Sequence, residues 1–377
     1  MKLVLVTGGC GYIGVHTIVE LLREGYEAVS LDNNVRSSER ILEGVERITG
    51  KRVRNVRVDL RDAAATEHAC SAFHDVLAVI HFAAFKTVPE SVAQPLLYYD
   101  NNLNSLVNIL RCTRDSHIPN FIFSSSCSVY GNTPGLPVSE ETPFGAAECP
   151  YARTKQMGEM IIQDSARAAA DTSFVSLRYF NPAGAHPSIE IGEALFGKPE
   201  NLVPAITQFA SGRMPELVVH GTDYPTRDGT CVRDYVHVSD IARAHVRALR
   251  CLEERGSNQR LMPMDPGSNL NYAVFNLGSG QGVSVLEAIR AFEKVSGRRL
   301  NYRIGPRRAG DVASVHADCT KAALWLDWKP EFTVEDMMQT AWHWELKQQR
   351  ALRPTVEARR RPVPAMVLPE PQAFPVR

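Results

Sequence analysis

Short apolar runs alternate with stretches of helical periodicity over the first half of the chain. The runs lie at 3–6, 28–31, 53–58, 77–82, 121–123 and 174–177. Runs of this length that are apolar throughout are typical of strands buried on both faces of a sheet. Between them, apolar side chains recur at the spacing of one helix face, for example over 13–22. This repeat of strand and helix predicts an α/β fold with a doubly wound parallel sheet and right-handed crossovers.

The pattern changes near residue 181, where prolines begin to interrupt it. Beyond this point the periodicity predicts helices over 201–212, 239–254, 284–296 and 333–348, and strands over 217–220 and 273–277. We therefore expect a sheet domain over 1–180, completed by later segments near 235–280, and a smaller mixed α/β domain over 181–350. Residues 256–271 are expected to form a polar loop, and the basic, proline-containing residues 351–377 a disordered tail.

The composition is that of an ordinary globular protein. Among 377 residues, 42 Lys and Arg balance 42 Asp and Glu, which argues against a basic surface for nucleic acid. No run approaches the ~18 apolar residues of a membrane helix and no signal segment is recognisable, so we expect a cytoplasmic protein without membrane contact. The eight cysteines show neither C-x-x-C pairs nor zinc-ligand spacing. Free thiols and no metal site are therefore expected.

A glycine-rich turn joins the first strand to the first helix. Gly8, Gly11 and Gly14 have G-x-x-G-x-x-G spacing directly after the run 3–6. Such a turn lets backbone N–H groups approach a pyrophosphate where a Cβ would block it, and the helix N-terminus adds favourable charge. A glycine turn between strand and helix predicts a dinucleotide site and hence a Rossmann-type domain.

An acidic residue, Asp32, stands at the end of the second strand. It lies about 20 residues beyond the turn, where it can accept hydrogen bonds from both ribose hydroxyls of a dinucleotide. It would repel a 2′-phosphate, so NAD is favoured over NADP as the cofactor. The alternative is that Asp32 caps a turn. Asp59 and Leu60 follow the third strand and are placed to meet the adenine, although that pair alone decides nothing.

Polar residues with catalytic potential end the fifth strand and open the next helix. Ser124, Ser125 and Ser126 lie at a strand end, where doubly wound folds bind ligands. Tyr151 and Lys155 are four residues apart and share a helix face. A free tyrosine has a pKa near 10, so a tyrosine base at pH 7 needs about three units of depression, or ~4 kcal/mol. A nearby ammonium and a positive nicotinamide can supply it, which predicts oxidation of an alcohol on a small substrate.

The chain resembles the extended short-chain dehydrogenase/reductase family and, within it, the UDP-glucose 4-epimerases, over roughly residues 2–346. The matching stretches are 6–14, 80–84, 98–102, 121–126, 177–187, 223–226, 232–237 and 306–311. The resemblance implies interconversion of UDP-galactose and UDP-glucose: C4 is oxidised with bound NAD, the 4-keto sugar turns over, and C4 is reduced on the opposite face. It also implies a homodimer through helices near 97–116 and 151–169.

By the same resemblance, Tyr151 is the acid/base, Lys155 holds the nicotinamide ribose and acidifies Tyr151, and Ser126 hydrogen-bonds the sugar 4-hydroxyl. The residues implied to line NAD are, besides Tyr151 and Lys155, Gly8, Gly11, Tyr12, Ile13, Gly14, Asp32, Asn33, Asp59, Leu60, Phe82, Ala83, Ala84, Lys86, Asn101 and Tyr179. Those implied to hold the UDP-sugar are, besides Ser126 and Tyr151, Lys86, Asn181, Asn201, Leu202, Val218, His220, Arg233, Arg308, Asp311 and Val315. Arg233 and Arg308 suit a pyrophosphate as cations, although either alone could be a surface charge.

Three positions depart from the family pattern. Thr154 stands where a serine usually precedes the lysine, and it keeps the hydroxyl. His220 replaces the usual aromatic residue near the uracil and can still stack. Val315 stands where some members carry a bulky aromatic residue beside the sugar. The hypothesis is that an N-acetylated UDP-sugar also fits there.

Two other functions are considered. A nucleotide-sugar 4,6-dehydratase or decarboxylase needs a further acid or base, and such relatives carry Asp or Glu just before the Val/Leu-Tyr-Gly segment. Cys127 and Ser128 stand there in this chain, which disfavours that chemistry. A regulator that senses a dinucleotide without catalysis would typically lose the tyrosine or the lysine, and both are present. An epimerase is therefore favoured.

Overall fold

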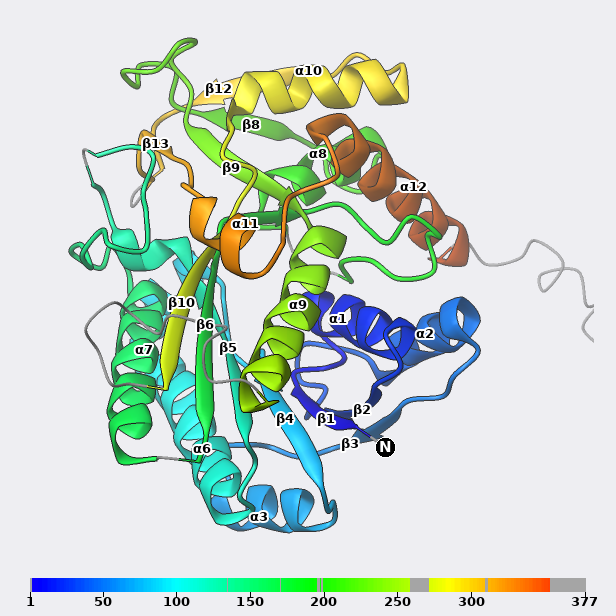
Figure 1. The fold of residues 1–377 in the computed structure, drawn as a ribbon. Coiled ribbons are helices and arrows are strands. Elements are labelled where there is room, and N and C mark those ends of the chain that lie inside the picture. Colours follow the sequence, from blue (N-terminus) through cyan, green and yellow to red (C-terminus); the bar gives the residue numbers. More distant parts are fainter. Residues whose placement is uncertain are drawn as a thin grey trace, which may run out of the picture.

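The described part of the chain forms a parallel sheet between two layers of helices, with a smaller group of strands and helices at one end of it (Figure 1). The computed structural model describes residues 2–133, 135–169, 171–194, 197, 199–257, 271–308 and 311–352. Most of the predicted loop 256–271 and nearly all of the predicted tail 351–377 lie outside these residues. Within the described ranges, no helix is both long and apolar enough to cross a membrane.

The central sheet has the strand order β10-β6-β5-β4-β1-β2-β3, and all of its neighbouring strands run parallel. The strands are β1 Leu3–Thr7, β2 Glu27–Leu31, β3 Arg54–Val56, β4 Val76–His81, β5 Asn120–Ser126, β6 Ser173–Tyr179 and β10 Tyr272–Leu277. The order reverses between β1 and β4. In open α/β sheets, ligands bind at the carboxyl ends of the strands at such a reversal. The predicted doubly wound parallel sheet is confirmed.

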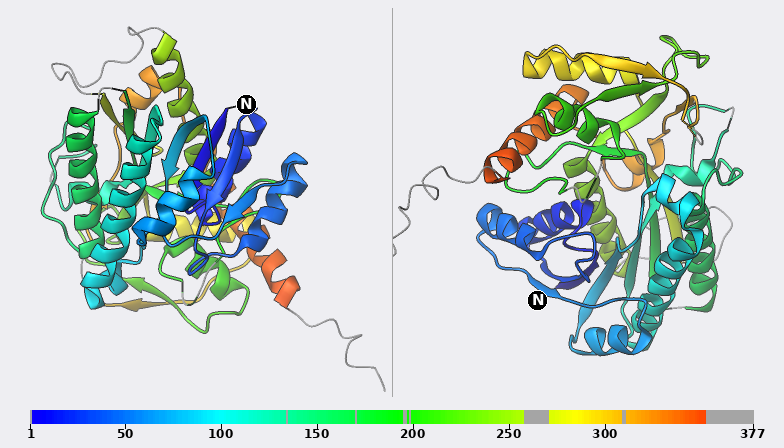
Figure 2. Two further views of the ribbon diagram at one scale, coloured as in Figure 1. Left: turned by 90° about the horizontal axis from the view of Figure 1, so that it is seen from below. Right: turned by 180° about the vertical axis from the view of Figure 1, so that it is seen from behind.

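Helices cover both faces of the sheet (Figures 1 and 2). On one face lie α1 Tyr12–Arg23, α2 Leu42–Thr49 and α9 Val238–Ser257; on the other lie α3 Ala63–Ser71, α6 Ser105–Asp115 and α7 Pro150–Ala168. Two short helices and one π-helical turn precede α6: α4 Val88–Ala93, α5 Pro95–Tyr99 and η2 Asp100–Asn104.

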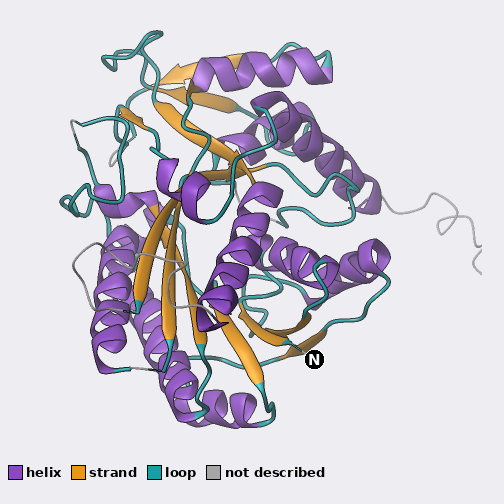
Figure 3. Cartoon of the chain, viewed as in Figure 1, coloured by secondary structure: helices purple, strands orange, loops and turns teal. Residues whose placement is uncertain are grey.

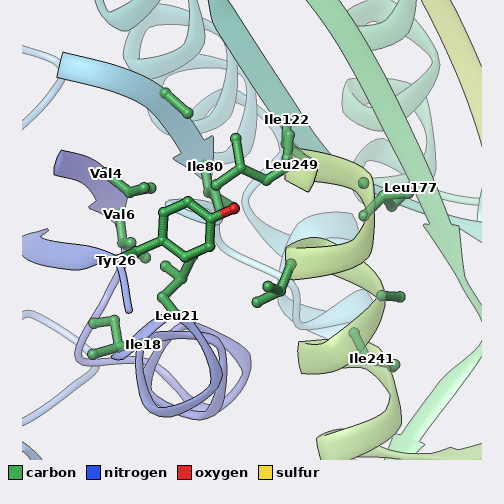
Figure 4. Packing of buried hydrophobic residues seen from close by; sticks show 14 of the residues in the cluster. Val4, Val6, Ile18, Leu21, Tyr26, Ile80, Ile122, Leu177, Ile241 and Leu249 are labelled. Atoms are coloured by element: carbon green, nitrogen blue, oxygen red, sulfur yellow. The ribbon is translucent and has the colours of Figure 1, made fainter. Parts of the chain in front are cut away.

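Apolar clusters fill the space between the sheet and each helix layer. Figure 4 shows the cluster under α1 and α9, where Val4 lies near Tyr26 and Ile80 lies near Leu249 of α9. The neighbouring strand residues Leu5 and Val79 belong to the cluster on the opposite face. Side chains of a strand alternate between faces. Both faces are covered here, so the strands must be apolar throughout, which explains the continuous apolar runs.

The smaller group lies beyond the carboxyl ends of the central strands (Figure 3). One small sheet has the order β11-β9-β13, with β7 also paired to β9, and a second pairs β12 with β8. Its strands are β7 Asn181–Ala183, β8 Leu217–His220, β9 Val232–His237, β11 Gly282–Ser284, β12 Tyr302–Gly305 and β13 Ser314–Val315. Its helices are α8 Leu202–Ala210, α10 Val285–Ser296, α11 Thr320–Trp325 and α12 Val334–Leu352.

The chain crosses between the two parts more than once. After β9 in the small sheet it returns as α9 on the large sheet, and β10 adds the edge strand beside β6. The segment near 235–280 therefore contributes to both parts, and a domain boundary at residue 180 stays a prediction. The third strand is shorter than the predicted 53–58, since only Arg54–Val56 pairs with β2 at the sheet edge.

Candidate functional site

The glycine turn lies at the carboxyl end of β1, at the reversal of strand order. Gly8 has a φ of +66°, and a Cβ there would lie 2.9 Å from the Ala83 backbone nitrogen. A Cβ on Gly14 would lie 2.4 Å from the Gly8 carbonyl oxygen. Gly11 is the N-cap of α1, and no side chain caps the first N–H groups of that helix. The turn thus requires glycine and presents free N–H groups, which fits the pyrophosphate of a dinucleotide.

The Asp32 carboxylate stands directly against this turn and is 8% exposed. Its Oδ2 accepts a hydrogen bond from the Cys10 backbone N–H at 3.1 Å, and its Oδ1 accepts from Asn34 N–H at 2.9 Å and Ser37 Oγ at 2.8 Å. Both interpretations of Asp32 are therefore compatible with its position. It caps a local turn, and it lies where a dinucleotide ribose would meet the glycine turn.

The other residues implied to line NAD lie around the same strand ends. The Ala83 N–H donates to Thr7 Oγ1 at 3.3 Å, and the Phe82 ring lies 4.7 Å from the His245 ring. Asn101 lies on the π-helical turn, a rare conformation that is often found at functional sites. Ala84, which follows Ala83, and Ile13, in the first turn of α1, are half-buried at this end.

Arg61 lies beside Asp59, one of the two residues expected to meet the adenine. Arg61 forms an ion pair with Asp59 at 2.7 Å, and this hydrogen-bonded guanidinium lowers the pKa of the Asp59 carboxyl. Leu60 is buried in the core, and its carbonyl accepts from Asn108 Nδ2 at 2.9 Å. Asn33 Oδ1 accepts a hydrogen bond from the backbone N–H of Val35 in the same loop. These contacts leave the adenine role a prediction.

Lys86 and Tyr12, which are both implied to bind NAD, lie close to each other in the structure. The Lys86 ammonium lies 5.8 Å from the centre of the Tyr12 ring and 3.0 Å from Glu193 Oε1. The Tyr12 hydroxyl donates to the Gly184 carbonyl at 2.5 Å, which ties the start of α1 to the smaller part of the molecule.

The three implied catalytic side chains converge at the end of β5. The Ser126 hydroxyl lies close enough to the Tyr151 phenol to lower its pKa. The Lys155 ammonium donates to the Ser124 carbonyl at 2.5 Å and lies 5.9 Å from the centre of the Tyr151 ring. Tyr179 pairs with Ser126 in the register of β5 and β6, so it also faces this corner. The local signal is Pro150, which starts α7 and sets Tyr151 and Lys155 on its first two turns.

Burial dominates the electrostatics of this corner. Desolvation raises the pKa of Tyr151, although the Ser126 hydrogen bond opposes the rise. Desolvation also lowers the pKa of Lys155 to about 8, while the Glu159 carboxylate opposes that change. The depressed tyrosine pKa expected from the sequence is therefore not produced by the protein alone. Positive charge from a bound nicotinamide would have to supply it.

The cations implied to hold the pyrophosphate meet at one carboxylate. Asp311 Oδ1 lies 3.4 Å from Arg233 Nη2 and 3.6 Å from Arg308 Nη2. Arg308 also donates to the carbonyl of the residue before Asn201, at 3.4 Å, so Asn201 and Leu202 at the start of α8 lie beside it. The structure thus gathers residues that are more than 100 positions apart in the sequence.

The remaining substrate candidates lie on the small sheets. Val315 pairs with Arg233 in the register of β13 and β9 and is buried with Val129. Asn181, in β7, has a buried Oδ1 without a hydrogen-bond partner among the described residues. Buried polar atoms usually have a partner, so this oxygen is a candidate to bind a ligand. Val218 and His220 lie together on β8, where His220 Nδ1 hydrogen-bonds the carbonyl two residues before Arg308 at 3.2 Å.

Sequence reasoning missed several side chains that fix this corner. Asn102 binds Thr154 Oγ1 at 3.0 Å, and Thr154 Oγ1 donates to the Tyr151 carbonyl at 2.7 Å, so the hydroxyl kept at position 154 is used. Glu159 and Arg178 form a buried ion pair next to the catalytic residues. The only sequence signal for Glu159 was its spacing of four from Lys155. A charge at such spacing on a helix usually faces solvent.

The comparison with known families agrees with this geometry. A family model described as the NAD-dependent epimerase/dehydratase family matches residues 4–261. The chain belongs to this family. The UDP-glucose 4-epimerase of Drosophila melanogaster is 44% identical over 353 residues, which are 91% of this chain and 96% of that protein. NAD is the cofactor of the family, and the glycine turn fits it.

Two solved structures of the family are similar over nearly the whole fold. A UDP-glucose 4-epimerase from Bifidobacterium longum in complex with NAD+ and UDP has a TM-score of 0.85 and 43% identity, and covers 92% of this chain and 99% of its own. The enzyme from Stenotrophomonas maltophila with bound NAD and formylated UDP-arabinopyranose has a TM-score of 0.86 and 43% identity, and covers 93% and 100%. The fold expected from the family resemblance is therefore confirmed.

The glycine turn gives a direct test of NAD binding. Gly14→Ala should weaken NAD binding about tenfold or more, because the Cβ would overlap the Gly8 carbonyl and push the turn off the pyrophosphate position. Titration calorimetry with NAD measures the effect. Gly135→Ala is the matched control, since a Cβ at Gly135 meets nothing within 4 Å. Equal NAD affinity in both variants would contradict the assigned position of the pyrophosphate.

Proposed function

We propose that the protein interconverts UDP-galactose and UDP-glucose. The observation that carries the proposal is the convergence of Ser126, Tyr151 and Lys155 at the strand end beside the glycine turn. The arginine group adjoins the same corner, because Val315, which pairs with Arg233, belongs to the cluster against which Cys127, the residue directly after Ser126, packs. This corner of the molecule can therefore bind a dinucleotide, the alcohol carbon of a substrate and the substrate's pyrophosphate.

The roles of the chain's own groups follow from their chemistry. Tyr151 takes the proton of the sugar 4-hydroxyl, directly or through Ser126, and returns it later. Lys155 supplies positive charge that favours the phenolate. Bound NAD would supply the hydride acceptor for C4 of the sugar and the hydride donor for its re-reduction. Ser126 hydrogen-bonds the 4-hydroxyl in either orientation.

The nucleotide part of the substrate must stay bound while the 4-keto sugar turns over. Arg233 and Arg308 contact one carboxylate, Asp311, and present donors suited to phosphate oxygens. A ligand held by its pyrophosphate leaves the sugar free to rotate while the intermediate stays bound. Asn201, Leu202, Val218 and His220 are proposed to hold the uridine at the outer end of this group.

The test is conversion of UDP-galactose to UDP-glucose by the purified protein without added reductant, followed by chromatography. We expect both sugars to reach the same ratio from either starting point. Formation of a 4-keto-6-deoxy sugar would instead favour a dehydratase. That alternative is disfavoured, because Cys127 and Ser128 offer a thiol and a hydroxyl where a carboxylate is needed.

Val315 supports a second substrate class. Its small side chain pairs across from Arg233 and packs with Val129, just after the serine strand end. This position adjoins both the pyrophosphate group and the catalytic hydroxyl, so a valine there takes less of the space beside the sugar than a bulky aromatic residue would. We propose turnover of UDP-GlcNAc and UDP-GalNAc. No turnover at high enzyme concentration would contradict it.

We also propose that the protein is a homodimer. Apolar side chains are exposed on neighbouring helices: Val92 of α4 is 60% exposed, Leu96 of α5 80% and Met160 of α7 48%. α4 and α5 both pack against α7. Leu103, just before α6, and Val107 and Leu110 on α6 are half-buried. Such a patch is typical of an interface.

The dimer is tested by placing a charge in this patch. Met160→Glu should convert the dimer to monomer, because a carboxylate buried in an apolar interface costs several kcal/mol. Light scattering after gel filtration gives the mass. Leu324→Glu, at an exposed leucine of α11, is the control, and a wild-type protein that is already monomeric would contradict the proposal. None of the eight cysteines is in a disulfide, which supports placement in the reducing cytoplasm.

A further inference from the structure

A buried ion pair joins the catalytic helix to the central sheet. Glu159 and Arg178 have side chains 0% and 5% exposed. Arg178 Nε donates to Glu159 Oε1 at 2.9 Å and Nη2 donates to Oε2 at 2.7 Å, which is a bidentate contact. Glu159 lies on α7, one helical turn beyond Lys155 and two beyond Tyr151. Arg178 lies on β6, next to β5.

The same carboxylate fixes the end of β5. Ser125 Oγ donates a short hydrogen bond to Glu159 Oε1. Ser125 lies between Ser124, whose carbonyl accepts from the catalytic ammonium, and Ser126, whose hydroxyl acts on the pKa of the catalytic phenol. A shift of Ser125 would therefore move both groups that the catalytic side chains contact.

The arginine is held as firmly as the carboxylate. Arg178 Nη1 donates to Tyr130 Oη at 3.0 Å, and the Tyr130 hydroxyl donates to Asn276 Oδ1 at 2.6 Å. Tyr272, also on β10, donates to Glu159 Oε2 at 3.3 Å. The network therefore spans β5, β6, β10 and α7.

Stability alone does not account for this pair. Apolar residues of similar volume usually stabilise a buried site as well as an ion pair does, because two charges lose their hydration. A negative charge at this place has a further effect on Lys155, which is 5% exposed. Burial favours loss of the Lys155 proton, and the Glu159 carboxylate opposes that loss. The other titratable groups near this ammonium are the Tyr151 phenol and the His81 imidazole on β4, and burial favours the neutral form of both.

We propose that Glu159 and Arg178 are positioning residues of the active site: they hold the Ser124–Ser126 strand end against α7, with the Glu159 carboxylate one helical turn from Lys155. Neither touches the substrate. The inference rests on the proposed epimerase function for its activity readout, but its electrostatic part can be measured without turnover.

The charge is tested first. In NAD-bound protein, Glu159→Gln should let Lys155 lose its proton about one pH unit lower than in the wild type. Carbon-13 NMR of the lysine ε-carbons follows this proton, with Lys155→Met providing the assignment. The alkaline limb of the kcat profile should move by the same amount, while KM changes little. The double variant Glu159→Gln with Arg178→Gln leaves no unpaired charge and serves if the single variant does not fold. Its shift should have the same direction but be smaller, because the arginine charge is removed as well.

The positioning role is tested separately with Ser125→Ala, which removes only the strand contact. It should lower kcat roughly tenfold to hundredfold through misplacement of its neighbours, with the Lys155 titration unchanged. Glu345→Gln is the matched control, because Glu345 is a 7% exposed carboxylate paired with Arg213 away from the site.

Two results would overturn the inference. One is an unchanged Lys155 titration in a folded Glu159 variant, and the other is an equal shift in Glu345→Gln. Full kcat in Ser125→Ala would remove the positioning part. A wild-type protein without epimerase activity would count against the proposed function instead, and the NMR titration would still decide the electrostatic part.

Discussion

Replacing Tyr151 with phenylalanine is expected to lower kcat about 10²- to 10⁴-fold, the usual contribution of a positioned acid or base. The variant keeps the ring, which lies beside Lys155, and loses only the hydroxyl, whose pKa Ser126 influences. NAD affinity should change little, because the glycine turn and Asp32 are untouched. KM for UDP-galactose should also change little, since the arginine group holds the nucleotide.

The experiment compares kcat, KM and NAD affinity of Tyr151→Phe with those of the wild type. Tyr302→Phe serves as the control, because Tyr302 is a 39% exposed tyrosine on β12. The control should retain wild-type kcat. If Tyr151→Phe also retains it, Tyr151 is not the acid/base, and the mechanism needs a different proton acceptor.

The features that the sequence predicted well are local. The strands of the central sheet are continuous apolar runs because both faces are covered, and the glycine turn depends on a few consecutive residues. The short strands β7, β11 and β13 contain two or three residues each and lie in polar or proline-containing sequence. Pairing partners that are distant in the chain create them, so no local pattern predicts them.

The site residues also divide into those that a local sequence pattern predicts and those that it does not. Tyr151 and Lys155 were found from spacing on one helix. Arg233, Arg308 and Asp311 came from the family resemblance, because their meeting depends on how segments more than 70 residues apart fold together. Glu159 was missed, since only the packing of β6 and β10 shows that it is buried.

The pKa of Tyr151 also depended on packing. Sequence reasoning counted the charges that would lower this pKa, but it had no measure of desolvation. In the structure, desolvation is the largest influence and acts in the opposite direction. The Tyr151 phenol in this fold therefore starts from a raised pKa. The positive charge of the bound cofactor must lower that pKa by more than the sequence suggested.

Acidification from pH 7 to pH 5 is expected to lower the free energy of unfolding steeply. The cause is a set of histidines that are buried in the neutral form. Burial lowers their pKa to about 3 for His16, His81 and His237, and to about 4 for His186 and His245. His16 and His186 lie side by side, with ring centres 6.3 Å apart, between α1 and the smaller part of the molecule.

The direction follows from proton uptake on unfolding. The folded pKa values lie below the unfolded value of about 6.5, so the unfolded chain binds protons more readily. The stability is complete above about pH 6.5 and is lost as pH falls toward the folded values. For a histidine with a folded pKa near 3, the loss at pH 5 is about 2 kcal/mol. Several such groups together approach the total stability of a typical domain, about 5–15 kcal/mol.

Carboxylates act in other pH ranges or with the opposite sign. Burial raises the pKa of Asp240 to about 6, so this group stabilises the fold as pH falls below 6 and offsets part of the loss. The hydrogen bonds from Arg36 lower the pKa of Glu90, so Glu90 loses its contribution only below its unfolded pKa, about 4.3. The loss between about pH 6.5 and 4.5 therefore belongs mainly to the histidines.

Urea unfolding at pH 7.5, 6.5, 5.5 and 5.0 measures this loss. His16→Gln should make it about 2 kcal/mol smaller at pH 5, because glutamine does not titrate and its amide can still donate to the Tyr12 carbonyl that His16 Nδ1 contacts. His343→Gln, at an exposed histidine of α12, should leave the pH dependence unchanged. A wild-type protein equally stable at pH 7.5 and 5.0 would contradict the prediction, and an equal effect of both variants would mean that burial is not the cause.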